Sequence, residues 1–298
     1  TRTQQQNWGI SGQAIVTDKL LGKENEFLFG GGYDQSVADF LQTSQFGHLM
    51  SNRSVNAVSA FDDSSRVGLS GDSITWSFFT QDTLSLTKDL HLTASGRYNY
   101  TSISNKDQIT VYGPESLSGK HVFDRFNPSV GLTYNPYEAI GYYANYSEGT
   151  RAPTTIELGC ANPDQPCRLP NSMAGDPALK QVITQNWETG FRGMLPGKVG
   201  WSLGYFNILN TNDIQFVAAP TNGYGYFKNF GKTQRQGIEA SLDRKVEDWS
   251  IGANYTYLDA TYQSTDILNS EFNDSAVDGI ITVNPGNHIP LAPKHTFK

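Results

Sequence analysis

Apolar and polar side chains alternate with a period of two along most of this chain. In the segment 139–148, for example, Ile140, Tyr142 and Tyr146 occupy even positions, whereas Asn145 occupies an odd one. Successive side chains of a β-strand point to opposite faces, so this pattern predicts strands with one apolar face. About eleven such segments follow one another, near residues 4–17, 25–37, 73–87, 90–103, 123–135, 139–148, 181–194, 198–212, 225–243, 249–264 and 293–298. No window has a period of 3.6 residues, so we expect almost no helix.

The connections between these segments alternate between short and long. Short connections lie near Lys19–Lys23, Lys88–Asp89, Asn135–Glu138, Leu195–Gly197 and Lys245–Asp248. Longer ones lie near Ala38–Asp72, Ser104–Val122, Gly149–Lys180, Asp213–Tyr224 and Ser264–Pro290. Outer-membrane barrels have short periplasmic turns and long extracellular loops in this order, whereas a soluble sandwich imposes no such rule. The pattern therefore predicts an all-β fold, an antiparallel transmembrane β-barrel.

The composition agrees with strands that face lipid on one side. Aromatic residues reach 12%, and the chain has 29 Gly, 15 Tyr and 16 Phe, whereas hydrophobic residues as a whole make up only 37%. No stretch approaches the 18 apolar residues of a transmembrane helix, but a barrel strand crosses the bilayer with roughly 9–11 alternating residues. The net charge of −7 argues against a nucleic acid as partner. We therefore expect outer-membrane lipid as the surroundings of the barrel.

Four motifs in the later part of the chain resemble those of one transporter family. They are YYANYSEGTRAPT at 142–154, DPALKQ at 176–181 with NWETGFR at 186–192, NFGKTQRQGIE at 229–239, and IPLAPKH at 289–295. In this order they are similar to the strand and turn motifs of TonB-dependent outer-membrane receptors. Residues 1–124 are compatible with the family but carry little of its signature.

The resemblance implies a fold and a function for the chain. The family barrel has about 22 strands, so residues 1–298 would supply roughly half of it. The plug domain, the energy-coupling segment and the last strands would be absent from this chain, which looks cut at both ends. The implied function is active uptake of a scarce nutrient, most often a ferric siderophore, in the outer membrane of a Gram-negative bacterium. The implied partners are the receptor's own plug domain and the inner-membrane TonB complex, reached through the missing N-terminal part.

Two other functions stay open at this stage. A passive porin would have the same strand pattern, no plug and a constricting loop folded inward. A secreted all-β carbohydrate-active enzyme would need paired carboxylates in a cleft and shorter strands. No Gly-x-Ser-x-Gly elbow and no paired histidine spacing occurs. We therefore predict no catalytic residues, no metal site and no cofactor.

Charged residues on the polar side of the predicted strands are candidates for the barrel lumen. They are Arg97, Glu188, Arg192, Arg235 and Glu239. One interpretation is an ion-paired wall that holds the plug, and the other is direct contact with the passing substrate. In the connections, Arg151, Tyr112, Tyr224 and Tyr226 are candidates for contact with a ligand, although Arg151 would equally serve to fix a loop to nearby carbonyl groups.

Cys160 and Cys167 are the only cysteines and lie in one connection rich in Pro and Asn. Because the compartment implied by a barrel is oxidising, we predict a disulfide that pins this loop. Metal binding is the weaker alternative, since no His or further Cys lies near them in the sequence.

Overall fold

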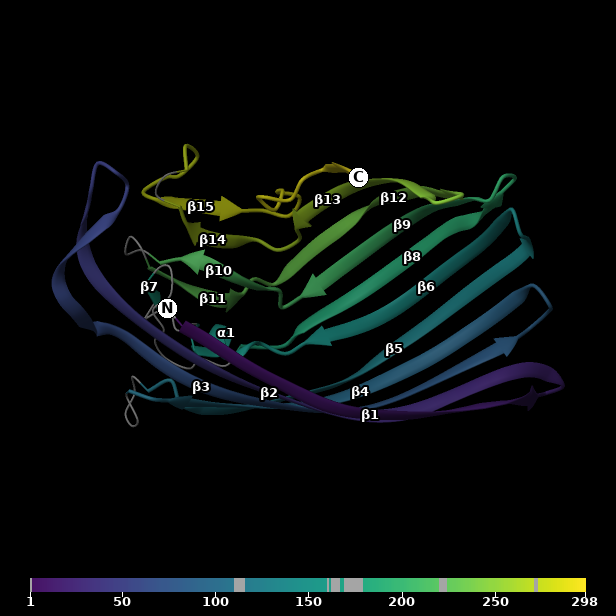
Figure 1. The fold of residues 1–298 in the computed structure, drawn as a ribbon, viewed down its shortest axis with the longest axis horizontal. Helices are drawn as coiled ribbons and strands as arrows, with labels where there is room; N and C mark the ends of the chain where they lie inside the picture. Colours follow the sequence, from purple (N-terminus) through teal and green to yellow (C-terminus); the bar gives the residue numbers. More distant parts are fainter. Residues whose placement is uncertain are drawn as a thin grey trace.

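Most of the chain forms a single large antiparallel sheet (Figure 1). The computed structural model describes residues 2–109, 116–159, 161, 167–168, 179–219, 224–270 and 273–298. Within them the sheet has eleven strands, each antiparallel to its neighbours, and β1 and β16 lie at its two edges. In order across the sheet they are β1 (Arg2–Leu20), β2 (Lys23–Leu49), β3 (Val55–Ser85), β4 (Leu90–Asp107), β5 (Gly119–Tyr137), β6 (Ile140–Arg151), β8 (Val182–Leu195), β9 (Val199–Thr211), β12 (Lys232–Val246), β13 (Trp249–Tyr262) and β16 (His295–Phe297).

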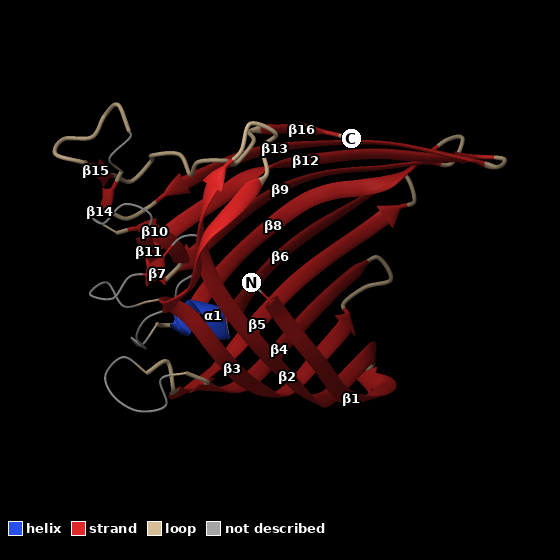
Figure 2. Ribbon diagram, turned by 60° about the vertical axis from the view of Figure 1, so that its left-hand side comes forward, coloured by secondary structure: helices blue, strands red, loops and turns tan. Residues whose placement is uncertain are grey.

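This architecture confirms the predicted all-β antiparallel fold, and short and long connections alternate along the sheet except between β2 and β3. At one end of the sheet, tight turns join the strands. The turn between β1 and β2 consists of Leu21 and Gly22, both with positive φ (53° and 75°), which is the conformation of a two-residue hairpin. The longer connections gather at the opposite end, which we call the long-connection end (Figure 2).

The predicted long connection over 38–72 is wrong. β2 runs on to Leu49 and β3 begins at Val55, so only residues 50–54 separate the two strands. The pairing passes two irregularities, between Gln42 and Ser44 and between Gln45 and Gly47. The sequence misses this part of the hairpin because apolar residues fall on both faces, as at the neighbouring positions Phe40 and Leu41, and the two irregularities interrupt the alternation.

The predicted strand over 225–243 is two strands. β11 (Tyr224–Asn229) joins a small sheet with β10 (Ile214–Ala218) and β7 (Cys167–Arg168), whereas β12 joins the large sheet. Gly231, with φ +80°, lies between them and turns the backbone in a way that a residue with a side chain rarely adopts.

The remaining elements also lie at the long-connection end. β14 (Asp266–Asn269) pairs with β15 (Ile280–Val283), and the five-residue helix α1 (Thr155–Gly159) follows β6. Among the residues that the structure describes, no helix is long and apolar enough to cross a membrane.

The two faces of the large sheet differ in chemistry. The sheet is curved, and α1 lies against its concave side, which we call the inner face (Figures 1 and 2). The opposite, outer face carries large apolar side chains in the open, including Trp8, Trp187 and Trp249, which are 58%, 60% and 74% exposed. Leaving such a band in water would cost free energy, so this surface has the chemistry of a lipid-facing wall.

Small apolar clusters lie on the inner side of the long-connection end. In one, Ile103 of β4 packs with Leu158 of α1 and Val182 of β8. In another, Phe40 of β2 and Leu69 of β3 are buried, and Phe227 of β11 packs against them. Since β11 follows β9 along the chain, the long connections fold over the inner face and reach the opposite part of the wall.

Candidate functional site

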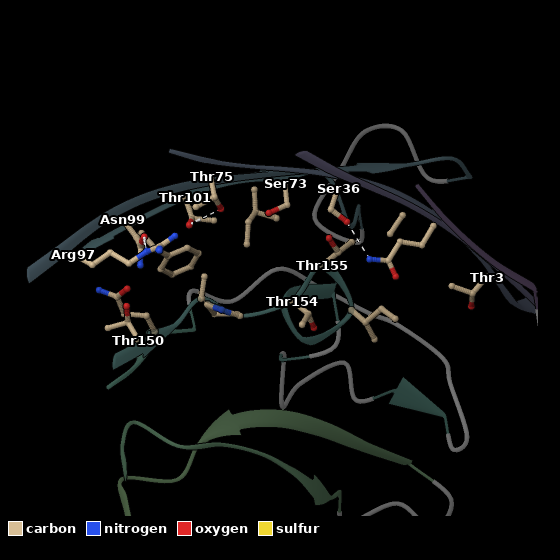
Figure 3. A pocket seen from close by; sticks show the side chains of 18 residues that line it. Thr3, Ser36, Ser73, Thr75, Arg97, Asn99, Thr101, Thr150, Thr154 and Thr155 are labelled. Carbon is tan, nitrogen blue, oxygen red and sulfur yellow. Dashed lines mark hydrogen bonds between the residues drawn. The ribbon is translucent and has the colours of Figure 1, made fainter. Parts of the chain in front are cut away.

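A pocket on the inner face lies between the wall and the segment that contains α1 (Figure 3). Strands β1 to β5 form one side of it, and residues 150–156 form the other. Its wall residues occupy alternate positions of each strand, as the register of the sheet requires: Ser36 pairs with Ser73, and Thr75 pairs with Thr101. The period-two pattern of the sequence thus becomes one continuous polar surface.

The chemistry of the pocket is unusual for a chain with a net charge of −7. Hydroxyl and amide side chains dominate its lining, and Arg97 is the only charged residue among the lining residues that the structure describes. The polar lining residues are Thr3, Gln5, Ser36, Ser73, Thr75, Asn99, Thr101, Thr150, Thr154, Thr155 and Gln181. The pocket therefore offers a cation and many hydrogen-bonding groups, and no carboxylate that would repel an anion lies among its described lining residues.

Two neighbours hold the Arg97 side chain in place. Its Nε donates a hydrogen bond to Asn99 Oδ1 (2.9 Å), and the guanidinium lies over the ring of Phe79, 5.4 Å from the ring centre. Within the described residues its two terminal nitrogens make no hydrogen bond or ion pair. Arg97 thus presents an oriented, planar pair of donors, the geometry that suits a bidentate anion.

The segment opposite the wall is built around a helix cap. The Glu157 backbone N–H donates to Thr154 Oγ1 (3.2 Å), and the Thr154 N–H donates to the Glu157 carboxylate (2.7 Å), which is the reciprocal arrangement of a capping box. Arg151 donates to the same carboxylate at 2.7 Å. Arg151, a candidate ligand contact from the sequence, is therefore engaged in fixing this segment to the end of β6.

α1 rests directly on the wall. The Asn105 side-chain amide of β4 donates to the Thr155 carbonyl (3.1 Å). Next to it, Gly71 of β3 faces the Thr155 side chain so closely that a Cβ at position 71 would overlap it. Leu158 of α1 is fully buried and packs against Ile103 of β4. These contacts fix the distance between α1 and the pocket wall.

Three other predicted lumen residues surround Tyr143 on the inner face. The register places Tyr143, Gly190, Gly204 and Glu239 in one row across β6, β8, β9 and β12. The Tyr143 ring extends along this row, and its hydroxyl lies 2.8 Å and 2.7 Å from where a Cβ would stand on Gly190 and Gly204.

The charged residues of this cluster approach Tyr143 from two strands, β8 and β12. The Arg192 guanidinium lies 5.6 Å from the centre of the Tyr143 ring. Glu188 pairs with Asn145, which is the next inward-facing residue after Tyr143 on β6. Glu239 of β12 lies at the end of the row that begins with Tyr143. Arg192, Glu188 and Glu239 therefore form a mixed-charge patch on the inner face, separate from the Arg97 pocket.

Arg235, the remaining predicted lumen residue, is tied to the long-connection end. Its guanidinium donates to Thr233 Oγ1 (3.2 Å) and lies 3.8 Å from the Asp213 carboxylate. The Thr233 hydroxyl donates to the same carboxylate at 2.6 Å. Arg235 thus fastens the connection that follows β9 to the start of β12.

The other predicted contacts are only partly described. Tyr112 and Cys160 lie outside the described residues. For Cys167 and Tyr224, which start β7 and β11, only the backbone is described, and Tyr226 of β11 is half-buried opposite Val217. The disulfide and the ligand contacts of these tyrosines stay predictions.

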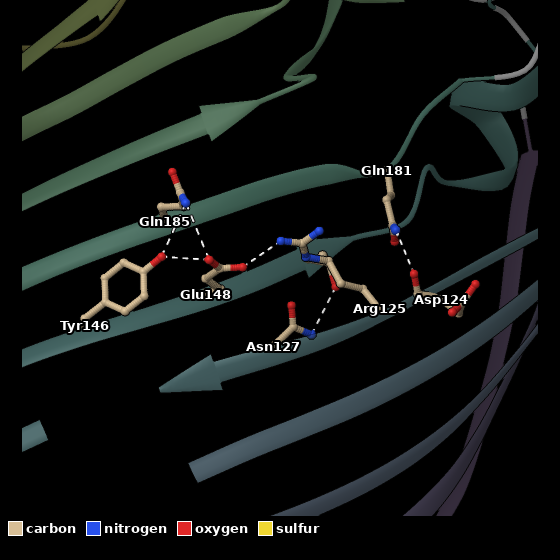
Figure 4. Close-up of polar contacts among 8 residues, drawn as sticks. Asp124, Arg125, Asn127, Tyr146, Glu148, Gln181 and Gln185 are labelled. Carbon is tan, nitrogen blue, oxygen red and sulfur yellow. Dashed lines mark hydrogen bonds and ion pairs between the residues drawn. The ribbon is translucent and has the colours of Figure 1, made fainter. Parts of the chain in front are cut away.

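A side-chain network closes the wall where backbone pairing between β5 and β6 stops (Figure 4). Their ladder ends at Ser129 and Ser147. Beyond that point Arg125 pairs with Glu148 at 2.6 Å, and Tyr146 donates to the same carboxylate at 2.7 Å. We call Arg125, Tyr146, Glu148 and Gln185 the seam network, because they join three strands, with Gln185 on β8.

Sequence reasoning missed most of the pocket. Asn99, Thr101 and Thr75 lie on polar positions of recognisable strands, so strand parity places them on the inner face. Parity does not say which strands face α1, because that depends on the fold of the connection after β6.

Comparison with known proteins identifies the fold. The family model for the TonB dependent receptor-like β-barrel matches residues 1–298. Among solved structures, the ferric-catecholate import receptor Fiu from K12 E. coli is similar, with a TM-score of 0.70, 14% identity, and coverage of 99% of this chain and 41% of that one. The siderophore receptor PiuA from Acinetobacter baumannii has a TM-score of 0.66 and 16% identity, covering 99% and 43%. The copper transporter OprC has a TM-score of 0.60 and 13% identity, covering 87% and 39%. The chain thus spans about two fifths of the length of these proteins.

Proposed function

The chain belongs to the TonB-dependent receptor β-barrel family, and from this premise we propose that it forms part of an outer-membrane receptor that takes up an anionic metal chelate, most readily a ferric siderophore. The family consists of outer-membrane receptors and transporters rather than enzymes. The proposed location is therefore the outer membrane of a Gram-negative bacterium, with the apolar outer face of the sheet in lipid.

The observation that carries the proposed cargo is the Arg97 pocket. Siderophores hold iron through oxygen atoms and commonly form complexes with negative charge. The described residues of the pocket include the Arg97 guanidinium, whose terminal nitrogens have no partner among them, many hydroxyl and amide groups and no carboxylate, a set that matches such a surface. Fiu and PiuA carry names that refer to ferric or siderophore import, which agrees with this class of cargo, whereas the name of OprC refers to copper.

The mixed-charge patch around Tyr143 has a different proposed role. It lies on the inner face, where Arg192 and Glu188 of β8 and Glu239 of β12 are arranged around Tyr143 of β6. We assign Glu188, Arg192 and Glu239 to contact with the receptor's own plug domain, which would lie in the lumen. Force from the inner-membrane TonB complex, acting on parts of the receptor beyond this chain, would then displace the plug and release the cargo.

Binding and transport by the complete receptor test this proposal. Ferric complexes of a catecholate, a hydroxamate and a carboxylate siderophore are titrated against the purified receptor, and radioactive iron uptake is measured in cells with and without a functional TonB complex. We expect at least one anionic ferric complex to bind with submicromolar affinity and to enter only when TonB is functional. Binding of none of them, or uptake that ignores TonB, contradicts the proposal.

One observation favours a passive channel as the second candidate. The α1 segment lies inward against the wall, as a constricting loop of a porin would. A porin would give a steady ion conductance in a planar bilayer and uptake independent of TonB. The receptor function predicts a closed barrel in the same bilayer until the plug is removed.

A further inference from the structure

The apolar outer face has a shallow hollow at Ala144, which we call the Ala144 hollow. One cross-strand row contains Leu92, Leu132, Ala144, Thr189 and Tyr205, from β4, β5, β6, β8 and β9 in turn. The neighbouring row toward the long-connection end holds Tyr146 and Trp187, whose ring centres are 4.4 Å apart. The row on the other side holds Tyr142 and Phe191, with ring centres 5.4 Å apart. The small side chain of Ala144, beside the Tyr146 and Trp187 rings, leaves a hollow of about 300 Å³.

The residues that border the hollow offer an occupant almost only apolar contacts. Val130, Trp187 and Tyr205 border it and are 46%, 60% and 43% exposed. The Thr189 hydroxyl is already engaged with the wall, 3.0 Å from the Tyr142 hydroxyl and 3.1 Å from the Tyr143 carbonyl. Glu188 borders the hollow only through its backbone, because its side chain lies on the inner-face parity of β8. An occupant therefore needs a flexible hydrocarbon surface and no polar groups.

The seam network indicates where the hollow would lie relative to the surface of the membrane. Tyr146 directs its hydroxyl away from the hollow, to Glu148 and Gln185. An aromatic ring with one apolar body and one hydrated tip marks the boundary between the hydrocarbon and headgroup regions of a membrane. The hollow lies on the side of the Tyr146 ring away from this hydroxyl and is continuous with the rest of the apolar outer face.

We propose that the Ala144 hollow is a binding site for one acyl chain of a membrane lipid, held between Trp187 and the Val130–Leu132 edge of β5. The proposal rests on the proposed function only in that the outer face must lie in a membrane. The small side chain at 144 lets the chain lie against the wall, where it gains contacts that a flat row of rings does not provide. A lipid held here differs from the surrounding bilayer lipid by its slower exchange.

Photochemical labelling tests the site on the complete receptor. The receptor is reconstituted in vesicles of a phospholipid that carries a diazirine in one acyl chain, and labelled peptides are mapped by mass spectrometry. We expect several-fold more label at 142–146 and 187–189 than at outward positions of β13. In detergent, the receptor should also retain one lipid in native mass spectra.

Two alanine-to-leucine variants, one inside the hollow and one outside it, provide a matched comparison of lipid retention. Ala144→Leu occupies the space with methyl groups, whereas Ala253→Leu makes the same change at an outward position of β13 that does not border the hollow. We expect Ala144→Leu to weaken lipid retention several-fold, because the leucine fills the space in which the chain makes its dispersion contacts. Ala253→Leu should leave it unchanged.

The outcomes separate this proposal from the proposed function. Label spread evenly over the outer face, or equal retention by both variants, overturns the lipid site and leaves the receptor function standing. Association of two receptors through the hollow, seen as a dimer that Ala144→Leu dissolves, also overturns it. Absence of label from the whole outer face would contradict both the site and the membrane location. Iron uptake by the two variants should match that of the unchanged receptor.

Discussion

Thr155 of α1 packs against Gly71 of β3 so closely that no other residue fits at position 71 without moving the helix. This contact, together with the hydrogen bond from Asn105 to the Thr155 carbonyl, sets the width of the Arg97 pocket. One glycine in the wall thus controls the position of a segment that lies far along the sequence.

Gly71→Ala should displace α1 and weaken the binding of ferric complexes to the complete receptor. Overfilling a packed contact costs roughly 1–3 kcal/mol, so we expect faster hydrogen exchange over 155–159 and several-fold weaker binding. Gly12→Ala on β1 is the matched control, because its added Cβ meets no atom within 4 Å. Equal behaviour of the two variants would show that α1 does not shape the binding site.

Arg97→Gln should weaken binding of an anionic ferric complex by about 10- to 100-fold, as expected for losing hydrogen bonds of roughly 1.5–3 kcal/mol from a charged donor. Isothermal titration with the complete receptor measures the change. Arg97→Lys keeps the charge without the planar pair of donors, so it should restore only part of the affinity. Arg244→Gln, at the short-turn end of β12, is the control and should bind normally. Unchanged affinity in Arg97→Gln would remove this residue from the site.

Thr154→Ala should loosen α1 by removing its N-cap, at a cost of about 1 kcal/mol. Hydrogen exchange at Leu158, which is fully buried in the native structure, reports the change. Thr154→Ser retains the hydroxyl that accepts from the Glu157 N–H and should exchange as slowly as the unchanged protein. If both variants exchange alike, the capping box does not stabilise this segment.

Gly204→Ala should destabilise the wall, because the new methyl group would meet the Tyr143 hydroxyl at 2.7 Å. We expect the temperature at which the complete receptor loses its folded mobility on detergent gels to fall, reflecting a cost of about 1–3 kcal/mol. Gly252→Ala on β13 meets only the Leu242 carbonyl, at 3.9 Å, and should leave that temperature unchanged. The double variant Gly204→Ala with Tyr143→Phe should recover part of the loss.

Cys160 and Cys167 should form a disulfide in receptor isolated from the outer membrane. A maleimide reagent should label neither thiol until a reductant is added, and labelling of both without reduction contradicts the prediction. Cys160→Ser would then leave Cys167 reactive. Cys160→Ser and Cys167→Ser should each bind the ferric complex more weakly if the bridge orders the loop.

The sequence predicted most of the large sheet, because apolar and polar side chains alternate with a period of two in strands that face lipid on one side. Trp249, Ile251 and Tyr255 all lie outward on β13, as their spacing requires. The same rule failed over 38–72, where apolar residues lie on both faces of β2 and β3 and two irregularities interrupt the alternation. Gly231 divides β11 from β12, although the polar and apolar positions on its two sides read as one strand.

By itself the sequence determined which side chains share a face: strand parity placed Arg97, Glu188, Arg192 and Glu239 on the inner surface. Only the tertiary structure decided that Arg97 lies opposite α1 while the other three surround Tyr143. Parity follows from local backbone geometry and needs no long-range contact. The position of α1 depends on the connection after β6 reaching back to β3 and β4, a contact between residues about fifty or more positions apart that leaves no periodic trace in the sequence.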